Sequence, residues 1–432
     1  MSGFSEPGNK LRLGCIADDF TGATDLASNL TEAGMRVVQT MGIPADETVV
    51  NADAVVIALK SRTLPPQEAV EQSLRALAWL KAHGAEQIYF KYCSTFDSVY
   101  TGSQRGNIGP VIDALMEACG ASLTIATPAF PANGRTVFKG HLFVGDVLLS
   151  ESGMRDHPLT PMRDANLQRV LQAQCSRKVG LLDYGVVRQG PDAIRTNLQT
   201  LQAQGIEVVV VDALDNQDLM NLGCAVRDLP LVTAGSGLAI GIPQNHGLRA
   251  AQNARLPAPS GAQAVVSGSC SVATNAQVAH FVEQGLPAYQ IDPSRLFAGE
   301  PVVEQALQWA ATVVGSQPLL IYSTAGPEQV QTAQSASGAL HLGSMLESAL
   351  AQIARGLVRL GVRQLLVAGG ETSGACVQAL QIHTLQVGPA VAPGVPWCHV
   401  PAEGDLPALH LLLKSGNFGA VDIFSAGFGV LQ

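Results

Sequence analysis

Short runs of consecutive apolar residues recur along the chain, separated by stretches whose apolar residues follow the 3.6-residue period of a helix. Continuous rather than alternating hydrophobicity predicts strands buried on both faces, which is typical of parallel sheets covered by helices. The predicted strands are 13–17, 55–59, 87–92, 123–127, 179–182, 207–212, 230–233, 264–267, 318–323 and 364–368. With intervening helices such as the one expected over 66–83, this pattern indicates an α/β fold.

The pattern breaks at residues 243–263, which hold few aliphatic side chains, several turn formers and prolines at 243, 257 and 259. This composition predicts a linker between two domains, 1–242 and 264–432, each with a mostly parallel sheet flanked by helices. Ligands of open α/β sheets lie beyond the carboxyl ends of strands and often between domains. We therefore expect the active site in the cleft between the two domains.

Composition narrows the classes of protein. The 432 residues suit two or three domains, and 26 Lys and Arg against 35 Asp and Glu leave no basic stripe for nucleic acid. No apolar run approaches the roughly 18 to 20 residues that span a bilayer, and the polar leader 1–10 lacks a signal-peptide core, so a cytoplasmic protein is expected. Eight scattered cysteines without a C-x-x-C spacing are expected to be buried, reduced thiols.

Two neighbouring carboxylates, Asp18 and Asp19, follow the first predicted strand. A helix should begin just after them, with Thr21 as its N-cap and Asp25 near the positive end of its dipole, and end at Gly34. Paired carboxylates at a strand end can grip sugar hydroxyls and accept a proton from one of them. Stabilisation of the turn is the alternative interpretation.

Basic and hydroxyl groups follow the next predicted strands. Arg62 comes after the second strand, and the third runs into Lys91, Ser94, Asp97 and Ser98. Acidic and basic groups together fit a ligand with a carboxylate and several hydroxyls, a sugar acid. Arg62 or Lys91 would take the carboxylate, Arg62 with two parallel hydrogen bonds, although a solvated surface role is open for each.

Other polar residues of this half are less decisive. Arg135 follows an Asn-Gly turn after the fourth strand and points either into the cleft or into solvent. His141 and His157 are expected to be structural, and no His, Cys or Asp spacing supports a zinc site.

The C-terminal half repeats one design three times, an apolar strand that runs into glycine and hydroxyl residues at 265–271, 365–375 and 411–419. Glycine lets backbone N–H groups approach a ligand, and a following helix N-terminus favours anions. Each turn alone is common in α/β folds, but three together favour a phosphate cradle for a nucleotide. None matches the P-loop pattern, and the 234–238 segment does not continue into a dinucleotide-binding fingerprint.

Several segments together resemble the four-carbon acid sugar kinase family over nearly the whole chain. They are ADDFTGATD (17–25), KYCSTFDS (91–98), GNIGPV (106–111), GRTVFKGHLFVGDVLL (134–149), HPLTPMRDANL (157–167), VSGSCS (266–271), AGGETSGA (368–375) and LKSGNFG (413–419). The KYCSTFDS form resembles the 3-oxo-tetronate branch more than the threonate and erythronate branches.

The resemblance implies an N-terminal domain for the sugar acid, a C-terminal domain for ATP, and phosphorylation of 3-oxo-tetronate on its terminal hydroxyl to the 4-phosphate. Mg²⁺ would be held mainly by ATP phosphates and water, with no metal ligand from the protein. Asp19 or Asp18 would be the catalytic base. The implied sugar-acid residues also include Lys91, Asp97, Ser98 and Asn107, and the implied ATP residues are Ser267, Ser269, Gly369, Gly370, Glu371, Thr372, Ser373 and Gly416.

Three alternatives stay open. Residues 99–105 form an insertion relative to the family pattern beside the expected pocket, so a threonate or erythronate kinase is one alternative. A nicotinamide-dependent hydroxy-acid dehydrogenase is another, disfavoured because no G-x-G-x-x-G follows the first strand. A non-catalytic sugar-acid sensor is the third, and it would not need the nucleotide half. Whether the chain forms a homodimer is left open.

Overall fold

The computed structural model describes residues 11–45, 52–98, 106–157, 160–250, 256–315, 317–323 and 339–431. It divides into two compact units, Met1–Gln252 and Asn253–Gln432. The expected linker 243–263 contains a short 3-10 helix, η4 (Pro243–His246), and the start of strand β12 (Ala262–Ser267). The sequence-based domain boundaries and the expected cleft between the domains stay predictions.

The N-terminal unit is built on a sheet whose eight strands all pair in parallel, in the order β2-β3-β1-β4-β11-β5-β10-β9. Its central strands are buried throughout, as the continuous apolar runs predict. The strands are β1 (Leu13–Ala17), β2 (Val37–Met41), β3 (Ala54–Ala58), β4 (Gln87–Lys91), β5 (Thr124–Thr127), β9 (Val179–Leu182), β10 (Val208–Val211) and β11 (Leu231–Ala234).

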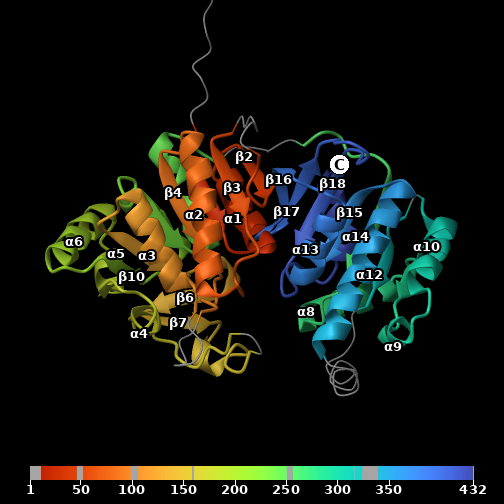
Figure 1. The fold of residues 1–432 in the computed structure, drawn as a ribbon, viewed down its shortest axis with the longest axis horizontal. Coiled ribbons are helices and arrows are strands. Elements are labelled where there is room, and N and C mark those ends of the chain that lie inside the picture. The colour runs from red at the N-terminus through yellow and green to blue at the C-terminus, as the bar shows by residue number, and fades with distance from the viewer. Residues whose placement is uncertain are drawn as a thin grey trace, which may run out of the picture. The chain divides into compact units, whose positions relative to one another are not determined.

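Helices flank this sheet, and α2 (Pro66–Ala82) packs against α3 (Ile108–Cys119) in front of the strands (Figure 1). A separate antiparallel sheet of β6 (Arg135–Phe138), β7 (His141–Val144) and β8 (Val147–Leu148) follows β5. The remaining helices are α1 (Phe20–Glu32), η1 (Pro131–Asn133), η2 (Leu149–Glu151), α4 (Leu167–Gln172), α5 (Tyr184–Val187), α6 (Pro191–Ala203), α7 (Asn216–Ala225) and η3 (Ser236–Gly241).

Helix α1 begins at Phe20, and its N-cap lies two residues before the predicted cap, Thr21. Asp19 has an extended backbone and its Oδ1 accepts the N–H of Gly22 at 3.1 Å, so Asp19 and not Thr21 is the N-cap. Thr21 instead donates its hydroxyl to Asp19 Oδ2 at 2.8 Å. Ala23, Leu26, Ala27 and Leu30 are buried on one face of the helix, as the periodicity predicts.

The C-terminal unit has a mostly parallel sheet in the order β13-β14-β12-β15-β18, extended by two antiparallel strands, β17 and β16. The strands besides β12 are β13 (Ala288–Gln290), β14 (Leu319–Tyr322), β15 (Val362–Ala368), β16 (Thr384–Ala392), β17 (Val395–Val400) and β18 (Leu409–Lys414). Its helices are α8 (Val272–Glu283), α9 (Pro293–Phe297), α10 (Val302–Val313), α12 (Ala339–Arg359), α13 (Gly370–Ala379), α14 (Ile423–Ala426) and η5 (Gly427–Leu431).

The core of this unit contains the buried rings of Phe281, Trp397, Phe424 and Phe428. All eight cysteines are free. Four are buried as expected, three are half-buried (Cys93, Cys119 and Cys224), and Cys270 is exposed, so the expectation that the thiols are buried is wrong at Cys270. Cys270 lies in the serine-rich turn after β12, which faces solvent, whereas Cys15, Cys376 and Cys398 lie inside the packed layers.

Candidate active site

The carboxyl ends of three neighbouring strands meet in the N-terminal unit. Ala17 at the end of β1 is in register with Ala58 at the end of β3 and with Lys91 at the end of β4. The backbone carbonyl of Asp18 accepts the N–H of Arg62 at 3.1 Å, and the Asp18 N–H donates to the Lys91 carbonyl at 3.1 Å. The parallel sheet therefore brings together residues that lie far apart in the sequence.

Two cations bind the paired carboxylates at this edge. Arg62 donates to Asp18 from Nε and Nη2, both at 2.9 Å, and its Nη2 also lies 2.6 Å from Asp19 Oδ1. The Lys91 ammonium lies 3.2 Å from Asp19 Oδ1 and 3.6 Å from Asp18 Oδ1. Four of the predicted site residues thus form one network of two anions and two cations.

The network sets the charge state of its members. Burial alone would raise the pKa of Asp19, but the positive charges of Arg62 and Lys91 outweigh it and hold that pKa well below the usual range. Burial likewise would lower the pKa of Lys91, but Asp19 and Asp18 raise it above its ordinary value. Asp19 and Lys91 are both charged at neutral pH.

The two carboxylates differ in access. The Asp19 side chain is 23% exposed and that of Asp18 is 8% exposed, while Arg62 is 24% and Lys91 only 3% exposed. Asp19 Oδ2 accepts only the Thr21 hydroxyl among the described contacts, whereas both oxygens of Asp18 are bound by Arg62. Asp19 is therefore the carboxylate, and Arg62 the cation, of this cluster that a small ligand can reach.

Asn107 and Ser98 make structural contacts. The Asn107 amide donates to the carbonyls of Ser61, Arg62 and Leu64 at 2.9 to 3.1 Å, so it holds the loop that carries Arg62. The Ser98 hydroxyl is buried and donates to Gln174 Oε1 at 2.6 Å. These contacts give Asn107 a positioning role and tie Ser98 to the protein interior.

The other predicted sugar-acid residues lie outside the ion network. Asp97 is buried and accepts the Thr95 hydroxyl at 2.6 Å, and Ser94 is half-buried in the turn after β4. Arg135 donates to the carbonyl of Asn133 in its own turn, and its buried Nε has no hydrogen-bond partner. Roles in sugar-acid binding for these residues stay predictions, and the 99–105 insertion lies outside the described residues.

The sequence pattern missed a buried carboxyl near this network. Asp25 in α1 accepts the hydroxyl of Ser236, whose carbonyl accepts the Asn29 amide at 2.8 Å. Burial raises the pKa of Asp25 to about 6, and its Oδ1 has no hydrogen-bond partner. Asp25 is thus held inside the protein rather than at the solvated helix terminus, and nothing in the local sequence pattern indicated its partner.

In the C-terminal unit, three more strand ends meet in register. Ser267 at the end of β12 pairs with Ala368 of β15, and Ala368 pairs with Lys414 of β18. The turns that follow touch one another, because Gly369 N–H donates to the Lys414 carbonyl at 2.8 Å and the Ser271 hydroxyl donates to the Gly416 carbonyl at 2.6 Å. The three glycine-containing turns predicted from the sequence are therefore adjacent.

Glycine is required where these turns touch. A Cβ on Gly416 would lie 2.5 Å from Ser269 Oγ and 3.1 Å from Ser271 Cβ. Gly369 has φ +121°, which side-chain-bearing residues rarely adopt, and its Cβ would lie 3.2 Å from Ser269 N. The turns approach so closely that side chains at either position would fill the space between them.

The turns also present groups suited to an anion. Helix α8 starts at the N-cap Ser271 and α13 at Gly369, so two helix N-termini lie at this edge. The Ser373 hydroxyl in the first turn of α13 is buried and has no hydrogen-bond partner among the described residues, while Thr372 is buried and Glu371 is exposed beside Gly370. An orphaned hydroxyl and two helix N-termini fit a phosphate group.

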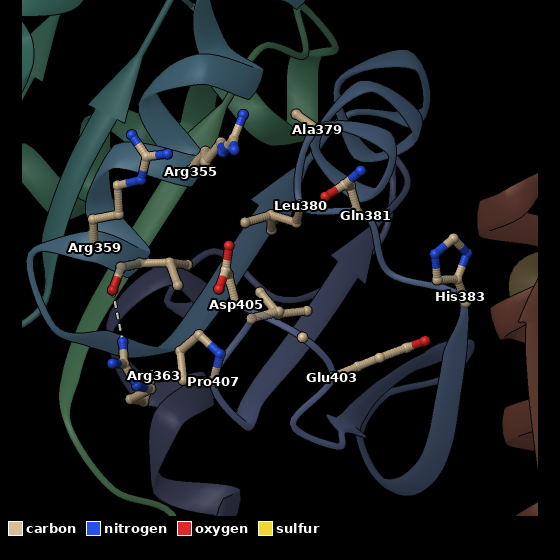
Figure 2. Close-up of a pocket in the computed structure, with 13 residues that line it drawn as sticks. Arg355, Arg359, Arg363, Ala379, Leu380, Gln381, His383, Glu403, Asp405 and Pro407 are labelled. Carbon is tan, nitrogen blue, oxygen red and sulfur yellow. Dashed lines mark hydrogen bonds between the residues drawn. The ribbon is translucent and has the colours of Figure 1, made fainter.

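A groove of about 700 Å³ lies elsewhere in the C-terminal unit (Figure 2). It is lined by the C-terminal ends of α12 and α13 and by the segment before β18, including Arg355, Arg359, His383 and Asp405. Arg363 at its edge donates to the Val358 carbonyl at 2.7 Å. These residues lie at the amino ends of β15 and β18, so the groove is separate from the glycine turns at the carboxyl ends.

Within the described ranges, no group of three or more His, Cys, Asp or Glu side chains could hold a metal ion. In the same part of the chain, no helix is long and apolar enough to cross a membrane. That Mg²⁺ is held chiefly by the nucleotide stays a prediction.

Each half of the chain matches the family model of a known domain. Residues 13–242 match the family model of a sugar-binding N-terminal domain, and residues 264–424 match that of a nucleotide-binding C-terminal domain. The chain is 54% identical over 425 residues to a 3-oxo-tetronate kinase of Burkholderia multivorans and 55% identical over 425 residues to one of Pseudomonas fluorescens, with 97% of each chain covered in both cases.

Solved structures of similar proteins share the fold. A protein of Salmonella typhimurium LT2 is 43% identical with a TM-score of 0.86, over 96% of this chain and 98% of its own. Haemophilus influenzae protein HI1011 is 44% identical with a TM-score of 0.79, over 97% and 100% of the two chains. With both domain models and full-length relatives in agreement, the chain belongs to the four-carbon acid sugar kinase family, alongside the 3-oxo-tetronate kinases.

Proposed function

We propose that the chain transfers the terminal phosphoryl group of ATP to the 4-hydroxyl of 3-oxo-tetronate, giving 3-oxo-tetronate 4-phosphate. The observation that carries this proposal is the network of Asp18, Asp19, Arg62 and Lys91 in the domain that matches sugar-binding relatives. It offers a sugar acid one reachable cation and one reachable carboxylate. The names of the full-length relatives favour the 3-oxo-tetronate substrate.

Arg62 is the group that would bind the substrate carboxylate. The Arg62 side chain is 24% exposed, whereas that of Lys91, at 3%, has little access to a ligand. Lys91 instead lies against Asp19 at 3.2 Å and keeps it charged. Of the two cations expected to bind the substrate carboxylate, we therefore propose Arg62.

Asp19 is the group that would accept the proton of the 4-hydroxyl. It is more exposed than Asp18, and one of its oxygens is free of the cations. A carboxylate with a lowered pKa is a weak base toward a free alcohol, but phosphoryl transfer has a loose transition state in which the alcohol is acidified as it attacks. Asp19 then positions the hydroxyl and takes its proton late, a contribution of roughly 10²- to 10⁴-fold.

The C-terminal turns would hold the nucleotide phosphates. The N–H groups at the starts of α8 and α13 and the orphaned Ser373 hydroxyl supply donors, and Gly416 leaves room beside Ser269. Mg²⁺ bound with the nucleotide would spread the phosphate charge during transfer. Three further points stay proposals: that catalysis takes place between the two domains, that the protein is cytoplasmic, and that it forms a homodimer.

A coupled ADP-release assay with a panel of four-carbon acids tests the proposal. We expect turnover with 3-oxo-tetronate to exceed that with D-threonate and D-erythronate, and the product to carry phosphate on the terminal carbon by NMR. Faster turnover of threonate or erythronate would assign the sister activity. No ADP release, together with absorbance at 340 nm on adding NAD⁺ and a hydroxy acid, would instead favour the dehydrogenase alternative.

A further inference from the structure

Lys414 is a fully buried lysine at the nucleotide edge of the C-terminal unit. It is the last residue of β18, its side chain is 0% exposed, and it is in register with Ala368, which precedes the Gly369 turn. Lysine is almost never fully buried unless its charge is paired. No role was expected for it from the sequence beyond its place before Gly416.

Among the described residues, the ammonium of Lys414 contacts only uncharged acceptors. Its Nζ lies 3.2 Å from Thr274 Oγ1 and 3.0 Å from each of the carbonyl oxygens of Ser415 and Gly416. The Phe424 ring lies below it, with its centroid 6.0 Å from Nζ. A buried ammonium without a counter-ion carries a desolvation cost that a nearby anion would offset.

Acidic groups on the surrounding elements do not compensate this charge. Glu371 in α13 and Asp422 before α14 are exposed, and burial is the cause that lowers the pKa of Lys414 to about 7. The other titratable groups of the elements packed around it are Arg363 of β15, His280 and Glu283 of α8, Cys376 of α13, Cys398 and His399 of β17 and His410 of β18. A pKa lowered to about 7 lets the protonation of Lys414 respond to a bound anion near neutral pH.

The contacts of Lys414 orient the Gly416 turn. The Gly416 carbonyl accepts hydrogen bonds from Lys414, from Thr274 at 2.8 Å and from Ser271 at 2.6 Å, so it is held toward the interior. In a trans peptide the C=O and the following N–H point in opposite directions, so the N–H of Asn417 points away from Lys414. Outward N–H groups in such a turn bind anions.

We propose that Lys414 is a positioning residue of the nucleotide site, whose buried ammonium balances the phosphate charge and holds the Gly416 turn in its anion-binding orientation. This inference rests on the proposed nucleotide site. When the phosphates bind, their negative charge stabilises the protonated ammonium. Nucleotide binding and protonation of Lys414 are therefore coupled, which a purely structural lysine would not show.

Titration calorimetry of the full chain with Mg-ADP tests the coupling. At about pH 7.5, buffers of different ionisation enthalpy should reveal the uptake of a fraction of a proton per nucleotide bound, because the pKa of Lys414 rises on binding. The uptake should shrink toward pH 6, where Lys414 is already protonated. Nucleotide affinity should fall as the pH rises above 7.

Variants separate Lys414 from other titrating groups. Lys414→Arg keeps the charge without titrating near neutral pH, so it should bind Mg-ADP without proton uptake. Lys414→Met should bind about 10- to 100-fold more weakly, as expected for the loss of a charged donor. The exposed Lys178 of the N-terminal unit provides a matched control, and Lys178→Arg should behave as the unmodified protein.

The outcomes distinguish this inference from the proposed function. If the unmodified protein binds no Mg-ADP, the nucleotide site itself is wrong. If it binds Mg-ADP without proton uptake, or if Lys414→Arg takes up the same amount, the role of Lys414 is overturned while the function stands. Circular dichroism shows whether each variant is folded. If a variant is not folded, the proton uptake of the unmodified protein on binding Mg-ADP, and its decrease toward pH 6, tests the role of Lys414.

Discussion

Arg62 holds Asp18 by two parallel hydrogen bonds of 2.9 Å, the geometry in which a guanidinium binds a carboxylate most specifically. The same Nη2 reaches Asp19 at 2.6 Å, so a single side chain separates two carboxylates that would otherwise repel each other. The arrangement of the acidic pair therefore depends on a residue from a different strand end.

Arg62→Lys is expected to raise the KM for the sugar acid about tenfold or more, because an ammonium cannot both hold Asp18 by two parallel bonds and bind the substrate carboxylate. The KM for ATP should not change, since Arg62 lies in the sugar-binding unit. Steady-state kinetics with each substrate varied in turn measures both constants. The exposed Arg188 supplies the control Arg188→Lys, and an equal KM in the two variants would refute the assignment of Arg62.

Asp19→Asn should lower kcat by roughly 10²- to 10⁴-fold, because the amide cannot accept the hydroxyl proton. Asparagine caps helices as well as aspartate does, so the start of α1 is preserved. Nucleotide affinity, measured by calorimetry, should stay within about twofold of that of the unmodified protein if the roles are separate. Asp228→Asn, at an exposed side chain, is the control, and unchanged turnover in Asp19→Asn would reject Asp19 as the base.

Asp25→Asn should make stability less dependent on pH. A pKa raised from 3.8 to about 6 means that the folded protein loses stability as the pH rises from about 4 through 6, by up to roughly 3 kcal/mol. Asparagine removes this loss, so the free energy of unfolding of the variant relative to the unmodified protein should be higher at pH 7 than at pH 4. Urea unfolding at both pH values measures this difference, and the same difference at both would contradict the raised pKa.

Gly416→Ala is expected to abolish nucleotide binding while sugar-acid binding persists. The added methyl group would meet Ser269 Oγ at 2.5 Å and Ser271 Cβ at 3.1 Å, which forces the turns apart. Gly343→Ala is a suitable control in the same unit, because nothing lies within 4 Å of a Cβ at that position. Equal ADP affinity in both variants, measured by calorimetry, would place the nucleotide elsewhere.

Ser373→Ala should separate stability from binding. The Ser373 hydroxyl is buried without a partner, so its removal should raise the free energy of unfolding by up to about 1 kcal/mol. Nucleotide affinity should fall about tenfold if the hydroxyl donates to a phosphate. A variant with lower stability and normal affinity would show that the hydroxyl serves the fold instead.

Much of this architecture is predictable from the sequence because parallel strands put their carboxyl ends at one edge. Asp18, Arg62 and Lys91 follow three different apolar runs, and this rule alone brings them together. The same rule joins the turns at Ser269, Gly369 and Gly416. Recognition of the strand ends was therefore enough to locate both clusters of residues.

The missed features have local physical causes. Strand β2 contains Gln39 and Thr40, which are buried but polar, so no continuous apolar run marked it. In β16, Gly388 and Pro389 interrupt the run, and its pairing with β17 is irregular there. Thr21 was expected as the N-cap because threonine is a common capping residue, but the cap is Asp19, whose Oδ1 accepts the Gly22 N–H.

The contact between Asp25 and Ser236 was beyond any local pattern. The two residues are 211 positions apart, and each lies in a segment whose local signal has an ordinary explanation, a helix start for Asp25 and a glycine turn for Ser236. Only packing of η3 against α1 brings them together. Long-range hydrogen bonds of this kind leave no periodicity in the sequence.

Gly22 has a further consequence for how the acidic motif can vary. A Cβ at this position would lie 1.7 Å from Lys91 Nζ and 2.2 Å from Asp19 Oδ1, so the glycine leaves room for a cation from another strand. Any larger residue at position 22 would displace the Lys91 ammonium and leave Asp19 with Arg62 as its remaining charge partner. Substitutions at positions 22 and 91 are therefore coupled, and a protein that gains a side chain at the first must adopt a shorter one at the second.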